Sequence, residues 1–322
     1  MKIAIVGTNF ISDNFAEAAR LVDGVEISAV YSRQYETGKC FANKHGIENV
    51  FTDYEKLLSD SSAEAVYVAS PNICHAEQSV KAMQQGKHVL CEKLMGATLE
   101  DFLLMKRTAD MTGRVLLEAM RPAHDPAYAL LKEALPKIGM VRRASLEYCQ
   151  YSSRYDRFKA GILTNAFNPK MKNSALADIG IYPLHVALSL FGMPKSVSGK
   201  SVFLENGFEG AGVLTLEYYN MLATVSYSKI SDSVNPSVIE GECGSITVDK
   251  ISAPTEIILK LRDNAPERLD FVSPKNNMIY EIAAFRDMCC KERAADYYLE
   301  LTEQAQRIVG EIYRTVGISE HF

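Results

Sequence analysis

Several features that mark specialised protein classes are missing from this 322-residue sequence. Lys and Arg form no cluster and the formal net charge is −5, so a nucleic-acid-binding surface is not indicated. The seven cysteines include no CxxC pair, and Cys289 and Cys290 are adjacent, which favours reduced thiols over a disulfide framework or a zinc site. The six histidines are scattered without HExxH or paired-carboxylate spacing, so we expect no metal site.

Long apolar runs are also missing. The apolar stretch at Met1–Gly7 is too short for a signal-peptide core or a membrane span, and no run of membrane length follows. With 47% hydrophobic and 23% charged residues, the composition is that of a globular enzyme. We therefore expect a cytoplasmic protein with a small-molecule substrate and no nucleic-acid or membrane partner.

The first 120 residues alternate short β-rich runs with longer helical patterns. This alternation predicts right-handed crossovers and a doubly wound parallel sheet, the Rossmann fold of a dinucleotide-binding domain. The predicted strands are 3–6, 25–31, 65–69, 88–91 and 115–117, and the predicted helices are 15–21, 36–45, 53–58, 75–85 and 98–111.

The pattern changes in residues 121–322, which we predict to form a substrate-binding and dimerisation domain of α+β type. Consecutive strands without intervening helices indicate a largely antiparallel, open-faced sheet. The last helices are candidates for packing back onto the first domain. The predicted strands are 141–151, 197–204, 211–218, 222–229, 236–240, 245–249 and 256–261; the predicted helices are 125–135, a segment ending at 191, 278–290 and 302–316.

A candidate phosphate-binding turn follows the first strand and reads Gly7-Thr8-Asn9-Phe10-Ile11-Ser12. In the GxGxxG fingerprint, glycines allow a tight turn and a close approach to the pyrophosphate at the helix N-terminus. Only Gly7 matches; Asn9, which tolerates positive φ, holds the second position and the small Ser12 the third. By itself this turn fits cofactor binding and a plain strand–helix connection about equally.

The end of the second strand reads Val30-Tyr31-Ser32-Arg33, with no acidic residue to bind a free ribose 2′-hydroxyl. Ser32 and Arg33 can instead bind a 2′-phosphate through charge-assisted hydrogen bonds. We therefore favour NADP(H), with NAD(H) possible; the alternative is that Arg33 only faces solvent.

Residues 67–95 carry a family resemblance. The pattern Pro71-Asn72-x-x-His75, followed by Ala-Met-x-x-Gly-Lys-His-Val at 82–89 and Cys-Glu-Lys at 91–93, resembles the glucose–fructose oxidoreductase/inositol dehydrogenase (Gfo/Idh/MocA) family. The resemblance extends over nearly the whole chain. The family usually continues Glu-Lys-Pro with a peptide bond that is often cis, whereas Leu94 replaces the proline here.

The resemblance implies a cofactor site at the strand ends and a catalytic lysine. An ammonium at this edge can bind a substrate hydroxyl and stabilise developing alkoxide charge, whereas a lone lysine would only lie along the surface. Asn72 could equally be a turn residue that caps the next helix, and His75 a helix-start side chain. The implied cofactor-binding residues are Ser70, Pro71, Asn72, His75, Glu92 and Lys93, of which Lys93 is also catalytic and substrate-binding.

A second constellation lies in Asp178-Ile-Gly-Ile-Tyr182-Pro-Leu-His185. Asp178 and Tyr182 are four residues apart and would share one face of a helix. The family pattern is Asp-x-Gly-x-(His or Tyr), and Tyr182 resembles the dihydrodiol, xylose and glucose–fructose branch. The Gly-Gly-Gly that often precedes it in the family is replaced by residues 172–174, Lys-Asn-Ser.

The implied mechanism is hydride transfer between nicotinamide and a hydroxyl or carbonyl carbon of a sugar, polyol or dihydrodiol-like substrate. Tyr182 would be the general acid–base, with its ordinary pKa of about 10 lowered by Lys93. Asp178 would orient the substrate or Lys93, and His185 would bind the substrate. The alternatives are a buried aromatic role for Tyr182 and a structural role for His185.

Two other functions remain open. The degraded glycine turn and the missing proline would also suit a non-catalytic NADP(H)-binding redox sensor, and the family includes lyases and glycosidases that retain their cofactor. An exposed apolar face of the second sheet would need a cover, so we predict a homodimer. The loop at 152–175, with Tyr155, Arg157 and Asn165, is expected to shape the substrate pocket.

Overall fold

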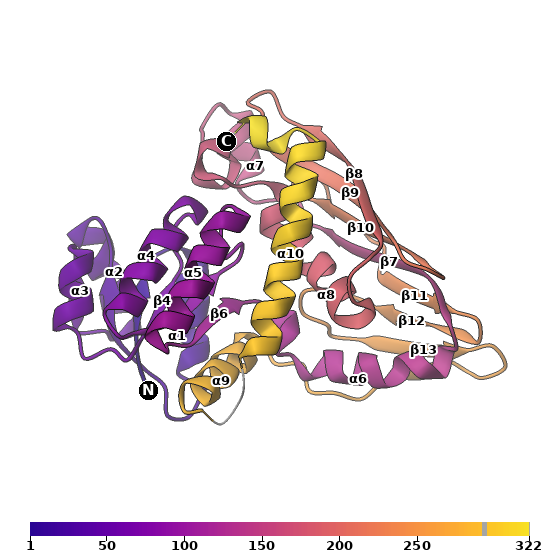
Figure 1. The fold of residues 1–322 in the computed structure, drawn as a ribbon, viewed down its shortest axis with the longest axis horizontal. Helices are drawn as coiled ribbons and strands as arrows, with labels where there is room; N and C mark the ends of the chain where they lie inside the picture. The colour runs from indigo at the N-terminus through magenta and orange to yellow at the C-terminus, as the bar shows by residue number, and fades with distance from the viewer. Residues whose placement is uncertain (292–294, 322) are drawn as a thin grey trace. The chain divides into compact units, whose positions relative to one another are not determined.

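The computed structural model describes residues 1–291 and 295–321 (Figure 1). The chain divides into two compact units, each with its own core. The first contains Met1–Met120 and Lys275–Thr302, and the second contains Arg121–Pro274 and Glu303–Phe322. The chain therefore returns to the first unit after the second sheet is complete.

The first unit contains a six-stranded parallel sheet in the order β3-β2-β1-β4-β5-β6. This is the Rossmann order, which reverses direction at β1 and leaves a crevice beyond the strand ends there. The predicted fold class is confirmed; only the short β3 was missed. The strands are β1 (Lys2–Val6), β2 (Glu26–Tyr31), β3 (Asn49–Phe51), β4 (Ala65–Val68), β5 (His88–Glu92) and β6 (Leu116–Ala119).

Alternate residues of these strands enter two separate cores, because successive side chains of a strand point to opposite faces. Ile3 and Ile5 pack with Phe15 and with Phe285 of α9, whereas Val66 packs on the other face. Helices therefore cover both faces. They are α1 (Phe10–Ala19), α2 (Tyr35–His45), α3 (Tyr54–Asp60), α4 (Asn72–Gln84), α5 (Leu99–Thr112) and α9 (Met278–Cys289).

The ends of α5 follow from its sequence. Thr98 accepts a hydrogen bond from the backbone N–H of Asp101, whose carboxylate accepts one from the Thr98 N–H, so the two form a capping box. Gly113 ends the helix in the left-handed conformation, at φ 64°. These ends agree with the helix predicted at 98–111.

The second unit contains an eight-stranded sheet in the order β14-β13-β12-β11-β7-β10-β9-β8. All pairs are antiparallel except β7 and β10, so the sheet is largely antiparallel as predicted. The strands are β7 (Val141–Cys149), β8 (Ser196–Phe203), β9 (Glu209–Glu217), β10 (Leu222–Ser228), β11 (Ser237–Gly241), β12 (Gly244–Val248), β13 (Ile257–Leu261) and β14 (Glu267–Arg268).

Helix α8 packs against the centre of this sheet, on β7 and β10 (Figure 1). Besides α8 (Ile181–Phe191), the remaining helices are α6 (Pro126–Ala134), the short α7 (Tyr155–Lys159) and α10 (Asp296–Thr315), which begins in the first unit and ends in the second. Short 3₁₀ turns lie at Arg121–Ala123, Leu135–Ile138, Asn165–Phe167, Pro169–Met171 and Ile318–His321.

The outward face of the second sheet differs from the apolar surface expected from the sequence. Leu214 is buried, so its neighbours Val213 and Thr215 point outward. Thr215 pairs with Thr224, which pairs with Ser145, so small hydroxyl side chains cross the centre of the sheet. The prediction of a large apolar face is therefore wrong, because small polar side chains occupy the centre of this face.

The segment before α8 is not the α-helical turn assumed from the spacing. Leu176–Gly180 forms a π-helix that continues directly into α8. A Cβ at Gly180 would lie 2.7 Å from Cγ of Tyr227, so only glycine allows this turn to approach β10. Since a π-helix has more residues per turn, the four-residue spacing of Asp178 and Tyr182 does not place them on one α-helical stripe.

Candidate functional site

The turn between β1 and α1 has the close backbone packing of a dinucleotide site. Gly7 has φ 106°, and a Cβ there would lie 2.7 Å from the carbonyl oxygen of Ala69 at the end of β4. A larger residue would have to push β1 and β4 apart. The turn thus has room for a nucleotide phosphate at the N-terminus of α1, which is one of the two interpretations that the sequence left open.

Asn9 shapes this turn by a different route from the predicted one. Its backbone is extended, with φ −91° and ψ −179°, so positive φ is not the reason for an asparagine here. The side-chain oxygen accepts hydrogen bonds from the N–H groups of Ile11 (2.9 Å) and Ser12 (3.2 Å). The side-chain nitrogen donates to the Ala69 carbonyl at 2.8 Å. Asn9 is therefore the N-cap of α1 and ties this helix to β4.

Ser32 and Arg33 lie at the carboxyl end of β2, where the ribose of a dinucleotide binds in this fold. Ser32 is buried, whereas Arg33 is exposed. A guanidinium with solvent access can reach a phosphate, so these two residues fit the predicted 2′-phosphate contact. Thr8 and Phe10 flank Asn9 on the surface of the β1–α1 turn.

The predicted residues after β4 have mainly structural contacts. Ser70 donates to the side chain of Gln78 at 2.6 Å, and Pro71, not Asn72, occupies the N-cap position of α4. His75 is fully buried, with Nε2 2.8 Å from the Ser70 carbonyl and Nδ1 3.0 Å from the Leu94 carbonyl. Burial lowers the pKa of His75. The ring therefore joins the loops that follow β4 and β5, and its buried nitrogens leave no atom to contact a cofactor.

Lys93 follows directly after β5, and the Lys93–Leu94 peptide bond is cis. The neighbouring Glu92 is buried and accepts a hydrogen bond from the Tyr67 hydroxyl at 2.5 Å. Lys93 itself is partly exposed. Burial raises the pKa of Glu118 to about 7, and the nearby Lys93 charge acts in the opposite direction. The Lys93 ammonium thus lies at the same edge of the sheet as the β1–α1 turn.

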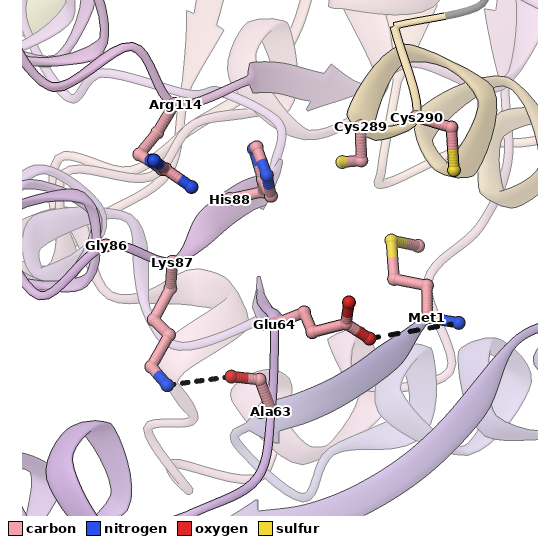
Figure 2. A pocket seen from close by; sticks show the side chains of 9 residues that line it. All are labelled: Met1, Ala63, Glu64, Gly86, Lys87, His88, Arg114, Cys289 and Cys290. Carbon is pink, nitrogen blue, oxygen red and sulfur yellow. Dashed lines mark hydrogen bonds and ion pairs between the residues drawn. The ribbon is translucent and has the colours of Figure 1, made fainter.

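A shallow pocket of about 360 Å³ lies at the opposite edge of this sheet. Figure 2 shows His88, Arg114 and the thiol of Cys289 around it, where the parallel strands begin. Burial raises the pKa of the Cys289 thiol to about 12, so this sulfur stays protonated at neutral pH. Ligands of parallel sheets bind beyond the carboxyl ends of the strands, so this pocket is not the candidate active site.

In the second unit, Tyr182 lies beside a cation that the sequence reasoning missed. Nη2 of Arg121 is 3.4 Å from the Tyr182 hydroxyl, and the guanidinium carbon lies 5.3 Å from the centre of its ring. Tyr148 of β7 contacts the same ring edge-on, with centroids 5.7 Å apart. Arg121 can stabilise negative charge on the phenol oxygen, which is the charge that a proton-accepting tyrosine needs.

Asp178 has a cationic partner within its own unit. Nζ of Lys229 lies 2.6 Å from Oδ2 of Asp178, and the lysine side chain is 4% exposed while the aspartate side chain is 33% exposed. The sequence led us to expect that Asp178 orients the substrate or Lys93. The ion pair with Lys229, the residue that follows β10, is a contact that the sequence did not suggest.

His185 lies in the core of the second unit. Burial lowers its pKa to about 3, helped by the charge of Lys132, so the ring is neutral at every pH at which the protein would be assayed. This matches the structural alternative for His185 and gives it no means of donating a proton to a substrate from a cationic form.

Glu209 is a second residue that the sequence did not single out. It is buried on β9, and Oε2 accepts a hydrogen bond from the Leu176 N–H at 3.0 Å, at the first residue of the π-helix. Ser201 donates to the other oxygen at 3.2 Å. Burial raises the pKa of Glu209 to about 7. This carboxyl therefore anchors the segment that carries Asp178.

Within residues 1–291 and 295–321, no group of three or more His, Cys, Asp or Glu side chains is placed to hold a metal ion. Over the same residues, no helix combines the length and the apolar character needed to cross a membrane.

Comparison with known proteins identifies the family. Residues 1–120 match the model described as an oxidoreductase family with an NAD-binding Rossmann fold, and residues 129–247 match the GFO/IDH/MocA C-terminal domain. The chain belongs to the Gfo/Idh/MocA family. It is therefore an NAD(P)-dependent oxidoreductase, as the motifs at 71–93 implied.

Relatives of this Gfo/Idh/MocA protein include characterised dehydrogenases. The NADP(+)-dependent scyllo-inositol 2-dehydrogenase IolU of Bacillus subtilis is 41% identical over 285 residues, which are 88% of this chain and 87% of the relative. The trans-1,2-dihydrobenzene-1,2-diol dehydrogenase of Mus musculus is 26% identical over 85% of this chain and 80% of its own. The fold matches KijD10, a 3-ketoreductase from Actinomadura kijaniata, with a TM-score of 0.87 at 20% identity, covering 98% of this chain and 97% of the other.

Arg121, Lys229 and Glu209 share one reason for having been missed. Each is an ordinary charged residue in its local sequence, and its partner lies far away along the chain. Arg121 carries a weak signal, because it directly follows the parallel strand β6, but nothing local marks the other two.

Proposed function

We propose that this oxidoreductase interconverts a secondary hydroxyl and a carbonyl on a cyclic polyol or sugar, with NADP(H) as cofactor. The observation that carries the proposal is the contact of Tyr182 with Arg121 next to the Asp178 segment. A phenol beside a fixed cation can exchange a proton with a substrate oxygen. The scyllo-inositol dehydrogenase named above makes scyllo-inositol the first substrate to test.

In this proposal Tyr182 takes the proton of the reacting hydroxyl, or returns it in the reverse direction. Asp178 accepts a hydrogen bond from a second substrate hydroxyl and so orients the ring. Lys93 donates to the reacting oxygen and stabilises its charge. The division of roles follows from the chemistry of the three groups: a phenol, a carboxylate and an ammonium.

The residues of the first unit would hold the cofactor. Gly7 and the capped start of α1 accommodate a pyrophosphate, and Ser32 with Arg33 suit a 2′-phosphate. When bound, the nicotinamide supplies the acceptor or donor of hydride. We propose NADP(H) over NAD(H), because Ser32 and Arg33, and no carboxylate, directly follow β2 at the position that would bind two free ribose hydroxyls.

The Tyr182→Phe variant tests the proposed acid–base role. It keeps the ring and its contact with Tyr148 but removes the hydroxyl, so kcat/KM for scyllo-inositol with NADP+ should fall by about 100-fold or more. Steady-state rates of NADPH formation at 340 nm measure this. Tyr218→Phe is the matched control, because its hydroxyl only donates to the Gly192 carbonyl at 3.1 Å.

An equal, small effect of both phenylalanine variants would contradict the acid–base role of Tyr182. Tight NADPH binding by the wild type without turnover of any polyol or sugar would instead favour the redox-sensor alternative. Retention of a copurified cofactor with no net consumption would indicate a lyase or glycosidase.

We also propose that the protein is a cytoplasmic homodimer. All seven cysteines are free thiols in the structure, which suits a reducing compartment. The outward face around Ser145, Thr215 and Thr224 carries small side chains that would let a second sheet approach closely. This face, continued by Val213 and Leu222, is the proposed contact.

A further inference from the structure

Among the described residues of the second unit, Lys229 is the most buried lysine, and the proposed mechanism does not use it. The residue is 3% exposed, and its backbone is fixed on both sides. Its N–H donates to the Gly210 carbonyl at 2.9 Å, and its carbonyl accepts from the Ser152 N–H at 2.9 Å. The second bond joins the end of β10 to the first residue of the loop at 152–175.

The Lys229 side chain connects two further segments. Nζ donates to the Ala166 carbonyl at 2.8 Å and lies 2.6 Å from Oδ2 of Asp178. The rings of Phe167 and Phe208 enclose the same ammonium, with their centres 4.9 and 5.1 Å away. A buried ammonium is stable only when such contacts offset its lost hydration. Lys229 and its partners therefore hold one another in place.

The partners of this ammonium belong to different functional parts. Ala166 lies in the 3₁₀ turn Asn165–Phe167, within the loop expected to shape the substrate pocket. Asp178 lies in the π-helix before Tyr182, and one-third of its side chain is exposed to a solute. One charge therefore fixes the carboxylate and the loop relative to each other.

We propose that Lys229 is a positioning residue, which orients Asp178 to accept a hydrogen bond from a substrate hydroxyl and anchors the loop at 152–175 beside it. The ion pair holds the Asp178 carboxylate in place, so a polyol hydroxyl adjacent to the reacting carbon meets a fixed acceptor. The inference on Asp178 rests on the proposed function, whereas the anchoring of the loop does not.

Hydrogen exchange tests the anchoring without any substrate. In Lys229→Met, peptides that cover residues 160–172 should exchange about tenfold faster or more than in the wild type, because the Ala166 carbonyl has lost its donor. Lys195→Met is the matched control, since Lys195 is exposed over the ring of Tyr219 in the same unit. Unchanged exchange in residues 160–172, or an equal increase throughout the second unit, would overturn the anchoring role.

Kinetics with scyllo-inositol and NADP+ test the action through Asp178. Asp178→Asn and Lys229→Met should each lower kcat/KM by about 30-fold while the KM for NADP+ stays unchanged, and the double variant should lose no more than Asp178→Asn alone. Losses that multiply in the double variant would show that Lys229 acts independently of Asp178 and would overturn the proposal.

The double variant also covers the case in which Lys229→Met folds poorly. Replacing both residues leaves no unpaired buried charge, so this protein should recover thermal stability without recovering kcat/KM. If thermal stability and kcat/KM both recovered in the double variant, Lys229 would have only a structural role, and the positioning role would be overturned. If the wild type turns over no polyol, the proposed function fails, and the exchange experiment still decides whether Lys229 anchors the loop.

Discussion

Arg33 is the residue on which the choice between the two nicotinamide cofactors depends. It is exposed at the end of β2 beside the buried Ser32, and the position holds no carboxylate that would repel a phosphate. A charge-assisted hydrogen bond to the 2′-phosphate would be made with NADP(H) and not with NAD(H).

We therefore expect Arg33→Ala to weaken NADPH binding by about 10- to 100-fold and to leave NADH binding unchanged. Titration of cofactor fluorescence measures both affinities. Arg107→Ala, which removes an exposed arginine from α5, should change neither. A parallel loss of NADH affinity in Arg33→Ala would show that the side chain shapes the turn and does not read the phosphate.

Two buried carboxyls give the protein a pH-dependent stability. Burial raises the pKa values of Glu118 and Glu209 to about 7 from an ordinary value of 4.5. The folded protein thus binds more protons than the unfolded chain between these values, so stability falls as pH rises from about 4.5 to 7 and is then constant.

Glu209→Gln should flatten this dependence in the second unit. The amide oxygen can still accept from the Leu176 N–H, but it carries no charge to desolvate. Relative to the wild type, the variant should gain stability on going from pH 5 to pH 8, by no more than about 3 kcal/mol. Thermal unfolding at the two pH values measures this, with Glu118→Gln as the comparison for the first unit. The same change in stability between pH 5 and pH 8 in the wild type and in Glu209→Gln would contradict the assignment.

Helix α1 is the element whose start decides the shape of the phosphate site. Its N-cap, Asn9, satisfies two N–H groups of the first turn and also bonds to β4. Helix α5 has an equivalent cap in Thr98, which lies after β5 and takes no part in the proposed phosphate contact. A comparison of variants at the two caps therefore distinguishes an effect on helix stability from an effect on the geometry of the β1–α1 turn.

Asn9→Ala and Thr98→Ala should each lower the free energy of unfolding by about 1 kcal/mol, the usual effect of removing an N-cap. Only Asn9→Ala should also weaken NADPH binding, because only its side chain holds the β1–α1 turn against Ala69. Denaturant unfolding and cofactor titration on the same samples give both quantities. If both variants lost NADPH affinity to the same extent, the specific role of Asn9 would be wrong.

At the scale of the whole molecule, the outward face of the second sheet determines the proposed assembly. Its central hydroxyl side chains are small, so a long charged side chain placed among them would prevent another sheet from packing there. The surrounding Val213 and Leu222 are exposed enough to contribute apolar area when covered.

We expect light scattering at micromolar concentration to give the mass of two chains for the wild type and of one chain for Thr224→Arg. Thr52→Arg, an exposed substitution in the first unit, should remain dimeric. A monomeric wild type, or a dimeric Thr224→Arg protein, would place the contact elsewhere or remove it.

Local patterns were sufficient to predict most elements of both units. The N-cap at Thr98, the glycine at 113 and the strand–helix alternation depend on neighbours within a few residues, so they are visible in the sequence. The residues proposed for the site, Lys93, Asp178 and Tyr182, were found through motifs, and their roles remain predictions.

Only the tertiary structure decided which charges face one another. Lys229 pairs with Asp178, Arg121 with Tyr182 and Glu209 with the Leu176 N–H, and each pair joins distant parts of the chain. The same holds for His75, whose motif suggested cofactor contact but whose ring is buried between two loops. Periodicity reports which face of an element is buried, but it does not report which buried partner the fold brings to that face.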